Sequence, residues 1–368
     1  MKIPLKELMP VLNLVKGFVA DKNILPALTH LYFKEDSVRA FSGSAGAVWY
    51  TPWSMGEEPL ILPAEDMVTV FQSLFDQGIE EVDLNPTATQ VTVKAGRFRG
   101  SLPKLVIDDA PTTFMQRAAP PRQVETGKDF WDDVDRVAFS VCKDATKPSL
   151  RGVCWASSGR LFTADSARIA TLAPRKGAAL KPPIAAGLLI PDHLLERLAG
   201  NRSKVTGVGM EGESILWCFM DPGMVFGSLM EGAFPITGTA TIVKKIQDAS
   251  KTRGTTINLV SAGMLGHVMA RLLYFVKPPT FRVAGVIEKD ALKLTVVDED
   301  GGMMAEESLP AVSVTGKQGG SFFVNGKFFS QALESVNSEF WLGDEPTDPL
   351  YFRSEDKRLE HLVIRLVA

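Results

Sequence analysis

The sequence predicts an α+β chain built from three tandem repeats, each with two helices backed by antiparallel strand pairs. Amphipathic helix patterns occur in two series of three along the chain. Short β-type runs with polar turns between them separate these helix patterns in the same order each time. Matching positions recur at intervals of about 130 residues, as between Gly100 in GSLP and Gly227 in GSLM.

The length of 368 residues is too great for one ordinary hydrophobic core, which agrees with several domains. The segments QRAAPPRQVET and KKIQDASKTRGTT are polar or carry Pro and Gly, as linkers between domains do. We therefore expect a first domain over residues 1–118, a second over 119–248 and a third over 249–368.

The first helix of each repeat has one apolar stripe. In PLKELMPVLNLVKGFV, the residues Leu5, Leu8, Leu12 and Val15 recur at steps of three and four residues. GKDFWDDVDRVAFSVC and SAGMLGHVMARLLYFV show the same rhythm. Each segment is expected to bury one face against strands.

The second helix of each repeat follows a short apolar strand and then a Pro or Asn, at Pro63, Pro191 and Asn325. Between the two helices lie the hairpin patterns LYFKEDSVRAFSG, VCWASSGRLFTAD and VIEKDALKLTVVD. A further hairpin pattern closes each repeat, and the last of these ends in the apolar run HLVIRLVA. This ending predicts a strand rather than a polar tail.

Composition excludes some classes of protein. The net charge of −3 gives no overall argument for nucleic-acid binding, so any basic surface must be local. Cys142, Cys154 and Cys218 lack metal-ligand spacing and cannot all pair with one another, which favours a reducing cytoplasm. No apolar run approaches the roughly 20 residues of a membrane helix, and the N-terminal segment lacks a signal-peptide pattern.

No motif for catalysis, metal binding or a cofactor is apparent. The histidines His30, His193, His267 and His361 fall in different elements without a metal-binding motif. The segment ADSAR contains a serine but lacks the G-x-S-x-G elbow, and GKQGGSFFVNGK lacks phosphate-loop spacing. The sequence therefore favours a protein that is not an enzyme and that binds no metal or cofactor.

Segments spread over the whole chain resemble the bacterial DNA polymerase III sliding clamp, its beta subunit. They are NILPALTHLYFKEDSVRAFSG, GRFRGSLPKLVIDDAP, SLRGVCWASSGRLFTADSARIATLAP, LMEGAFP, FFVNGKFFSQALESV and the ending PLYFRSED…LVIRL. These segments occur in the order that the family has. The resemblance is to a divergent member, and a phage-encoded clamp would fit it.

The resemblance implies a ring-shaped homodimer, joined head to tail, that encircles double-stranded DNA without reading its sequence. Such a clamp is a cytoplasmic processivity factor whose other partners are the replicative DNA polymerase and the clamp loader. DNA contacts are then expected at Lys22, Lys143, Lys147, Arg197 and Arg202, and less strongly at Arg271. Pro148 and Ser149 replace an aromatic pair of the family, which alters one of its DNA contacts.

The resemblance also implies a dimer interface and a pocket for partner peptides. The interface is expected between the strand GRFRGSLP of one subunit and LLYFV of the other, with Leu102, Phe275 and Val276. The pocket is expected to bind an apolar anchor of the peptide. Its residues are Leu150, Arg168, Ile169, Pro235, Thr239, Asn325, Phe328, Leu362, Val363, Ile364 and Arg365.

Two departures from the family lie in this pocket. Ser166 and Ala167 stand where the family has Gly and His, and Thr239 stands where it has an arginine. We therefore expect a pocket whose peptide preference differs from that of a typical bacterial clamp.

Two other functions are compatible with parts of the sequence. One is an enzyme whose catalytic site is assembled across domains, which no acid–base or metal constellation supports. The other is a clamp-like protein that binds peptides as a regulatory hub without encircling DNA. Lys22 and the lysines at 143 and 147 distinguish the second alternative from a clamp, because a hub does not require them.

Overall fold

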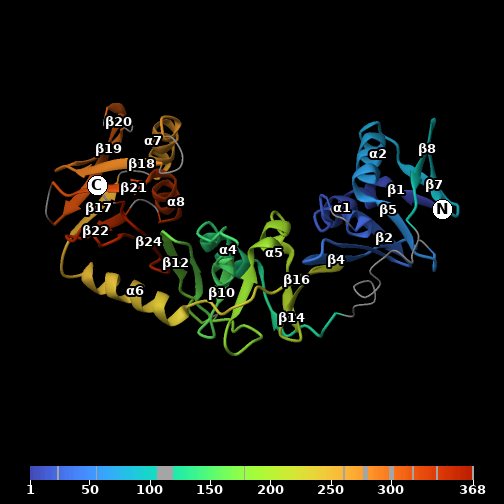
Figure 1. Cartoon of the computed structure of the whole chain (residues 1–368), viewed down its shortest axis with the longest axis horizontal. Coiled ribbons are helices and arrows are strands. Elements are labelled where there is room, and N and C mark those ends of the chain that lie inside the picture. Colours follow the sequence, from blue (N-terminus) through green and yellow to red (C-terminus); the bar gives the residue numbers. More distant parts are fainter. Residues whose placement is uncertain are drawn as a thin grey trace. The chain divides into compact units, whose positions relative to one another are not determined.

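The computed structural model has the predicted α+β architecture, with helices and antiparallel strands in a repeated order (Figure 1). It describes the chain except residues 23–24, 55, 106–118, 178, 260–261, 277–280, 298–301, 317–318, 337–338 and 367–368, and no side chains for residues 262–265 and 297.

One series of elements (strand, helix, four strands, helix, three strands) occurs three times, and we call its copies repeats 1, 2 and 3. Repeat 1 contains β1 (Lys2–Pro4), α1 (Leu5–Lys16), β2 (His30–Lys34), β3 (Ser37–Phe41), β4 (Ala45–Tyr50), β5 (Leu60–Pro63), α2 (Ala64–Asp76), β6 (Glu81–Pro86), β7 (Gln90–Ala95) and β8 (Phe98–Pro103). Repeat 2 contains β9 (Val124–Glu125), α4 (Lys128–Ala138), β10 (Gly152–Trp155), β11 (Leu161–Ala164), β12 (Arg168–Leu172), β13 (Leu188–Pro191), α5 (Asp192–Arg197), β14 (Gly207–Glu211), β15 (Ile215–Phe219) and β16 (Gly223–Ser228). Repeat 3 contains β17 (Thr255–Leu259), α7 (Ala262–Tyr274), β18 (Arg282–Ile287), β19 (Ala291–Val297), β20 (Met303–Thr315), β21 (Ser321–Asn325), α8 (Gly326–Val336), β22 (Glu339–Leu342), β23 (Leu350–Arg353) and β24 (Leu359–Val363).

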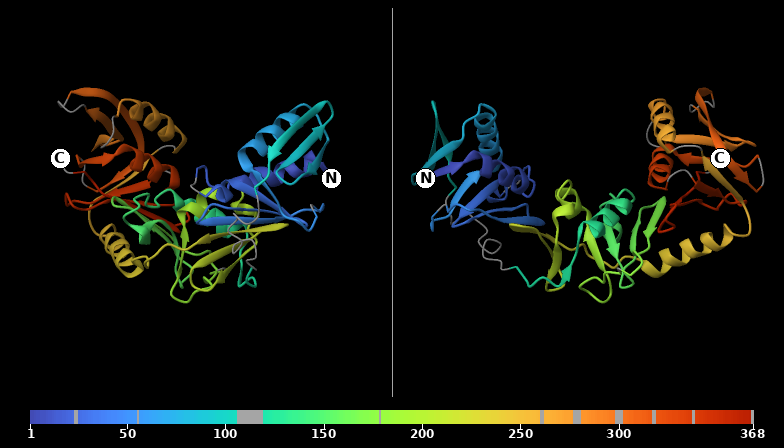
Figure 2. Two further views of the ribbon diagram at one scale, coloured as in Figure 1. Left: turned by 45° about the vertical axis from the view of Figure 1, so that its right-hand side comes forward. Right: turned by 180° about the vertical axis from the view of Figure 1, so that it is seen from behind.

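The connecting segments contain further helices. The short 3-10 helices are η1 (Pro26–Thr29), η3 (Pro148–Leu150) and η4 (Arg202–Lys204). The helix α6 (Ile236–Ala249) joins repeat 2 to repeat 3 and is drawn in yellow in Figure 2.

Each repeat orders its strands into two groups of four in the same way. Repeat 1 has β1-β6-β7-β8 and β5-β2-β3-β4, and repeat 2 has β9-β14-β15-β16 and β13-β10-β11-β12. Repeat 3 has β17-β22-β23-β24 and β21-β18-β19-β20, and its β17 also pairs with the far half of β20. The three predicted repeats are thus confirmed as repeats of strand order as well as of sequence.

Successive repeats are joined by antiparallel strand pairing. The strand β4 of repeat 1 pairs with β16 of repeat 2, with Ala45 opposite Gly227. The strand β12 of repeat 2 pairs with β24 of repeat 3, with Arg168 opposite Val363. The strand groups thereby merge into continuous sheets of eight and twelve strands.

This pairing divides the chain into two compact units. Unit 1 consists of residues 1–131 and 191–229, and unit 2 consists of residues 132–190 and 230–368. The division passes through repeat 2, because one of its strand groups continues the sheet of repeat 1 and the other continues the sheet of repeat 3. The predicted domain limits after residues 118 and 248 describe repeats, and they stay predictions.

Paired helices cover the strands of the repeats at either end of the chain. The helices α1 and α2 pack against each other, as do α7 and α8 (Figure 1). Leu5, Leu8, Leu12 and Val15 are fully buried, which confirms the predicted apolar stripe of α1. Fully burying an apolar side chain of this size stabilises a fold by roughly 1.5–3 kcal/mol, so these stripes fix how the helices lie on the sheets.

Repeat 3 has an aromatic core beneath α8. Phe329 of α8 lies 5.6 Å from Phe340 and 5.9 Å from Phe352, measured between ring centroids, and both pairs meet edge to face. All three side chains are fully or almost fully buried. Edge-to-face contacts of this kind add about 0.5–1.5 kcal/mol each beyond the burial of their area.

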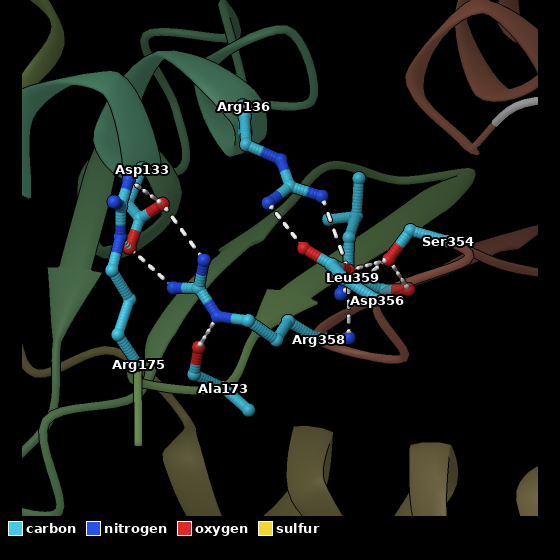
Figure 3. Close-up of polar contacts among 8 residues, drawn as sticks. All are labelled: Asp133, Arg136, Ala173, Arg175, Ser354, Asp356, Arg358 and Leu359. Carbon is cyan, nitrogen blue, oxygen red and sulfur yellow. Dashed lines mark hydrogen bonds and ion pairs between the residues drawn. The ribbon is translucent and has the colours of Figure 1, made fainter. Parts of the chain in front are cut away.

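A cluster of ion pairs links α4 of repeat 2 to the turn between β23 and β24 of repeat 3 (Figure 3). The Asp133 carboxylate accepts hydrogen bonds from Arg358, at 3.2 Å from Nη1 to Oδ1 and more closely from Nη2, and Arg175 lies 3.3 Å away. The Nε of Arg358 also donates to the carbonyl oxygen of Ala173 at 3.0 Å. The Arg358 side chain of repeat 3 is thus held by two groups of repeat 2.

A second ion pair lies beside the first in Figure 3. Arg136 of α4 donates to Oδ2 of Asp356 at 2.9 Å, while Ser354 and the backbone N–H of Arg358 donate to Oδ1 at 2.5 and 3.0 Å. Burial alone would raise the pKa of Asp356, but these hydrogen bonds hold it well below its usual range. The turn is therefore fastened to α4 through a carboxylate that stays ionised.

Replacing Arg358 by Gln should lower the free energy of unfolding by about 1–3 kcal/mol, because Asp133 loses its closest cation while its carboxylate stays nearly buried. The neighbouring exposed residue provides a matched control, since Lys357→Gln removes the same charge outside the cluster. Urea denaturation of both variants measures the difference. Equal stability of the two variants would contradict the role given to the cluster.

Candidate functional site

The residues predicted to bind a partner peptide all lie in unit 2. They come from the end of η3, the start of β12, the residue before α6 and its first turn, the end of β21 and the start of α8, and β24 with the residues after it. In that order they are Leu150; Arg168 and Ile169; Pro235 and Thr239; Asn325 and Phe328; and Leu362, Val363, Ile364 and Arg365. The pairing of β12 with β24 places Ile169 opposite Leu362, which brings two of these groups together.

Arg168 is nearly buried and connects β12 to α8. Its Nε and Nη2 both lie 2.8 Å from Oδ2 of Asp165, and its Nη1 donates to Oε1 of Gln331 at 2.5 Å. The guanidinium lies 3.9 Å from the centroid of the Phe328 ring, within cation–π range. Because Asp165 balances its charge, Arg168 orients Phe328 and the β11–β12 turn rather than offering a free cation to a ligand.

The apolar part of the site rests on two buried clusters. Leu150, Ile169 and Ile236 pack against a cluster that contains Phe162 and Phe234. Ile169 also packs against the cluster that α6 forms with β22, β23 and β24, which contains Leu362.

The predicted residues at the end of β24 divide into a buried floor and an exposed residue. Leu362 and Val363 are buried beneath the surface, whereas Ile364 is 54% exposed. The backbone N–H of Ile364 donates to the carbonyl oxygen of Ala167 at 2.8 Å, which holds this exposed side chain beside the β11–β12 turn. Ile364 is therefore the apolar residue of the set that a ligand can most readily cover.

Asn325 and Thr239 have structural roles that the sequence did not reveal. The Oδ1 of Asn325 accepts hydrogen bonds from the backbone N–H groups of Lys327 and Phe328, at 3.1 and 3.2 Å, and so caps the first turn of α8. Thr239 is 5% exposed on α6. These positions shape the site, but their side chains have little surface for a ligand.

Sequence reasoning missed the residues that position Arg168. Asp165 lies three residues before Arg168, and a carboxylate at that spacing across a turn is a signal that could have been found. Gln331 and the half-buried ring of Phe139 approach Arg168 from other parts of unit 2, and nothing local in the sequence indicates this.

Lys147 contacts the β11–β12 turn of this site, although the resemblance implies that it binds DNA. Its Nζ lies 2.5 Å from Oγ of Ser166 and 3.6 Å from Asp144. Ser166 is one of the departures from the family, and here its hydroxyl provides a partner for Lys147. A DNA contact by Lys147 stays a prediction, and such a contact competes with these interactions.

The other cations predicted to bind DNA differ in their surroundings. Lys22 and Lys143 are exposed. Arg197 donates to the carbonyl oxygens of Gly17 and Val19, and Arg202 donates twice to that of Leu195, at 2.6 and 3.1 Å. Burial lowers the pKa of both arginines. Their guanidinium groups hold the protein backbone, so Lys22 and Lys143 remain the more accessible candidates for phosphate contact.

The residues predicted for a dimer interface also differ in exposure. Leu102 and Val276 are 6% and 9% exposed within their own units, and Phe275 is 40% exposed. Phe275 meets Tyr274 edge to face at 5.4 Å, and Tyr274 is 85% exposed. The end of α7 thus presents two neighbouring aromatic rings to solvent.

The described residues contain no group of three or more His, Cys, Asp or Glu side chains placed to bind a metal ion. No helix among them combines the length and the apolar character that crossing a bilayer requires.

Bacterial DNA sliding clamps of known structure align with the whole chain. The clamp from Bartonella birtlesii, solved bound to griselimycin, aligns with a TM-score of 0.83 over 100% of this chain and 99% of its own, at 16% identity. The DNA polymerase III beta subunit from Thermotoga maritima aligns with a TM-score of 0.81, the same coverage and 16% identity. The clamp from Bacillus subtilis aligns with a TM-score of 0.80, at 16% identity, over 100% of this chain and 98% of its own.

The similarity of this chain to these clamps lies in its structure rather than in its sequence. No family sequence model matches the chain, and no curated protein sequence matches it. The structure therefore has the three-repeat sliding-clamp fold in a sequence that has diverged far from those of these clamps.

His361 of β24 is fully buried near Arg168. Its ring lies 4.8 Å from Phe139 and 5.9 Å from Phe352, between centroids, and neither ring nitrogen has a hydrogen-bond partner among the described residues. Burial, aided by the charge of Arg168, lowers the pKa of His361 from 6.5 to about 3. The folded protein thus holds a neutral imidazole at a position where the unfolded chain binds a proton near neutral pH.

His361 should make the fold less stable as the pH falls from about 6.5 toward 3, because the unfolded state then binds one more proton than the folded state. The slope contributed by one such group is at most about 1.4 kcal/mol per pH unit. Urea denaturation between pH 7 and pH 5 should show a smaller slope for His361→Phe than for the unchanged protein. The exposed His267→Gln is the control, and an unchanged slope in His361→Phe would contradict the prediction.

Proposed function

We propose that the chain is a DNA sliding clamp, a ring-shaped processivity factor without enzymatic activity of its own. In this proposal it works in the cytoplasm as a head-to-tail homodimer. It encircles double-stranded DNA without reading sequence and tethers the replicative DNA polymerase and other partners through the peptide site. The clamp loader is the further partner, because a closed ring needs opening to admit DNA.

The observation that supports this proposal is a pair of strands that each have one edge, or part of one edge, unpaired among the described residues. The last strand of repeats 2 and 3, β16 and β24, each pairs with the preceding repeat, at β4 and β12. By the same rule, β8 of repeat 1 and β20 of repeat 3 require each other. Among the described residues, β8 ends its sheet, and the first half of β20 pairs only with β19.

The exposure of these strands shows what the missing neighbour would cover. Almost every residue of β4 and β12 is buried. In β20, by contrast, residues 303–308 are exposed or half-buried, with Met303 67% exposed and Met304 39% exposed. In β8, Phe98 is 39% exposed and its neighbours are mostly exposed. Open apolar edge strands favour pairing with another chain.

The charges on the two edges are complementary. The strand β8 and the turn before it carry Arg97 and Arg99, which are exposed, while β20 carries Glu306 and Glu307. Within the chain, Glu306 pairs with Lys293 of β19 at 3.0 Å and Glu307 pairs with Arg271 of α7 at 2.5 Å, so an incoming arginine would share these carboxylates. If β8 of a second copy lay beside β20, its arginines would approach these glutamates, which carry the opposite charge. The exposed rings of Tyr274 and Phe275 lie at the end of α7, the helix that carries Arg271.

A dimer joined in this way has two such junctions and six repeats, and it can hold DNA by enclosing it. Enclosure requires only weak phosphate contacts, and these would be sensitive to salt. Lys22 and Lys143 are the accessible cations for this role. A net charge of −3 is therefore compatible with a clamp, because the lining alone needs to be basic.

One observation favours the alternative, a clamp-like hub that binds peptides without encircling DNA. Lys147, Arg197 and Arg202, which are predicted to bind DNA, each contact groups of their own chain. A hub needs the peptide site but not a basic lining. Encirclement is what separates the two functions, and it can be measured without a loader.

The test uses a linear duplex with biotin at both ends, onto which a ring can thread. Protein added before streptavidin should stay on the duplex through a wash at high salt, because the blocked ends trap it. Protein added after streptavidin should wash off. A pull-down measures the amount of protein retained on the duplex. Equal retention in both orders of addition would contradict encirclement and favour the hub.

Variants of the lysines refine the same experiment. The double variant Lys22→Ala with Lys143→Ala should reduce the amount of protein bound to DNA at low salt, because each phosphate contact contributes to binding. Retention should still depend on whether the protein is added before or after streptavidin. Lys251→Ala removes an exposed lysine of the α6 end and serves as the control.

A further inference from the structure

A polar cavity of about 520 Å³ lies in unit 2 where β17, β21 and β22 begin or end. Its walls include Gly254, Gly319, Gly320 and Gly343, together with the side chains of Asp344 and Arg365. Arg365 also belongs to the predicted peptide site, and it directly follows the exposed Ile364. The cavity therefore adjoins the peptide site through one residue.

Several positions in the wall of this cavity favour glycine. Gly254 and Gly319 have φ of +82° and +80°, which side-chain-bearing residues rarely adopt. A Cβ on Gly320 would lie 2.9 Å from Cδ2 of Leu342, and one on Gly343 would collide with the carboxylate of Asp348. Backbone groups thus form much of the wall, at positions where a side chain would be strained or would collide with a neighbouring residue.

Arg365 is the cation of this cavity, and its hydrogen-bonding capacity is incompletely used. Its Nε donates to the carbonyl oxygen of Asp348 at 2.6 Å, whereas Nη2 is covered and has no acceptor among the described residues. The Asp348 carboxylate is engaged by Arg253 at 3.0 Å. Arg365 differs in this from Arg168, whose charge Asp165 balances directly.

Asp344 limits which ligand the cavity accepts. Its Oδ2 accepts the backbone N–H of Gly254 at 3.1 Å, which holds a negative charge in the cavity wall. The Asp344 carboxylate repels any anion that enters, so a single carboxylate paired with Arg365 is favoured over a group of higher negative charge. A phosphate group, with its greater negative charge, is disfavoured for the same reason.

We propose that this cavity receives an acidic side chain of the partner peptide, whose carboxylate pairs with Arg365 while the peptide's apolar anchor covers Ile364 and Phe328. This inference rests on the peptide site of the proposed function. A carboxylate supplies the acceptor that the guanidinium lacks, and a guanidinium turned toward the cavity can bind it through two parallel hydrogen bonds. An extended peptide advances about 3.3 Å per residue, so the acidic residue lies close in sequence to the anchor.

The test begins with a random peptide library displayed on phage and selected on the full chain. Peptides selected by the unchanged protein should combine apolar residues with a nearby Asp or Glu. Selection on Arg365→Gln should keep the apolar residues and lose the acidic preference. Lys327→Gln, which removes an exposed cation of α8 outside the cavity, should keep both.

Affinities of one selected peptide then give a decisive comparison. Changing its acidic residue to the matching amide should weaken binding to the unchanged protein about tenfold or more, and should make little difference to Arg365→Gln. Equal affinities of the acid and amide peptides for the unchanged protein would overturn the inference.

Two further variants keep the outcome interpretable. Ser321→Glu places a carboxylate at the exposed cavity wall and should remove the acidic preference without altering Arg365. Phe328→Ala should weaken every selected peptide. If the selected peptides bind Phe328→Ala with unchanged affinity, the peptide site itself is wrong. If their affinity for Phe328→Ala falls but the selected sequences show no preference for Asp or Glu, only the role of Arg365 is wrong.

Discussion

Antiparallel pairing between strands of successive repeats is the constraint on which the rest of this structure depends. It joins β4 to β16 and β12 to β24, and it turns three small repeats into sheets that run across their boundaries. Backbone hydrogen bonds make this kind of junction tolerant of sequence change, because they require strand geometry rather than particular side chains. This explains how the clamp fold persists at 16% identity to the clamps from Bartonella birtlesii and Thermotoga maritima.

The candidate peptide site is a product of one of these junctions. Pairing of β12 with β24 places Ile169 opposite Leu362, and the hydrogen bond from Ile364 to Ala167 extends the contact past the end of the strand. The ion pairs of Asp133 and Asp356 fasten α4 to the adjoining turn. The same contacts that stabilise the junction therefore fix the distance between the two halves of the site.

Much of the fold could be predicted from sequence, because apolar periodicity reports directly which face of a helix or strand is buried. The stripe of α1 and the repeated order of helices and hairpins followed from this pattern. The roles of charged residues could not be predicted in the same way. Arg197 and Arg202 bind backbone carbonyls, and Lys147 binds Ser166, through contacts between residues distant in sequence or outside any periodic pattern. The division into units was also hidden, since it depends on which edges pair.

The central claim is that β8 of one copy pairs with β20 of another. Hydrogen–deuterium exchange, followed by mass spectrometry across a range of protein concentrations, tests it most directly. Backbone amides of Phe98–Pro103 and of residues 303–309 should become protected together, in proportion to the fraction of dimer, because both strands gain a neighbour in the same step. A dimer that forms while both segments exchange as fast as in the monomer would contradict the account.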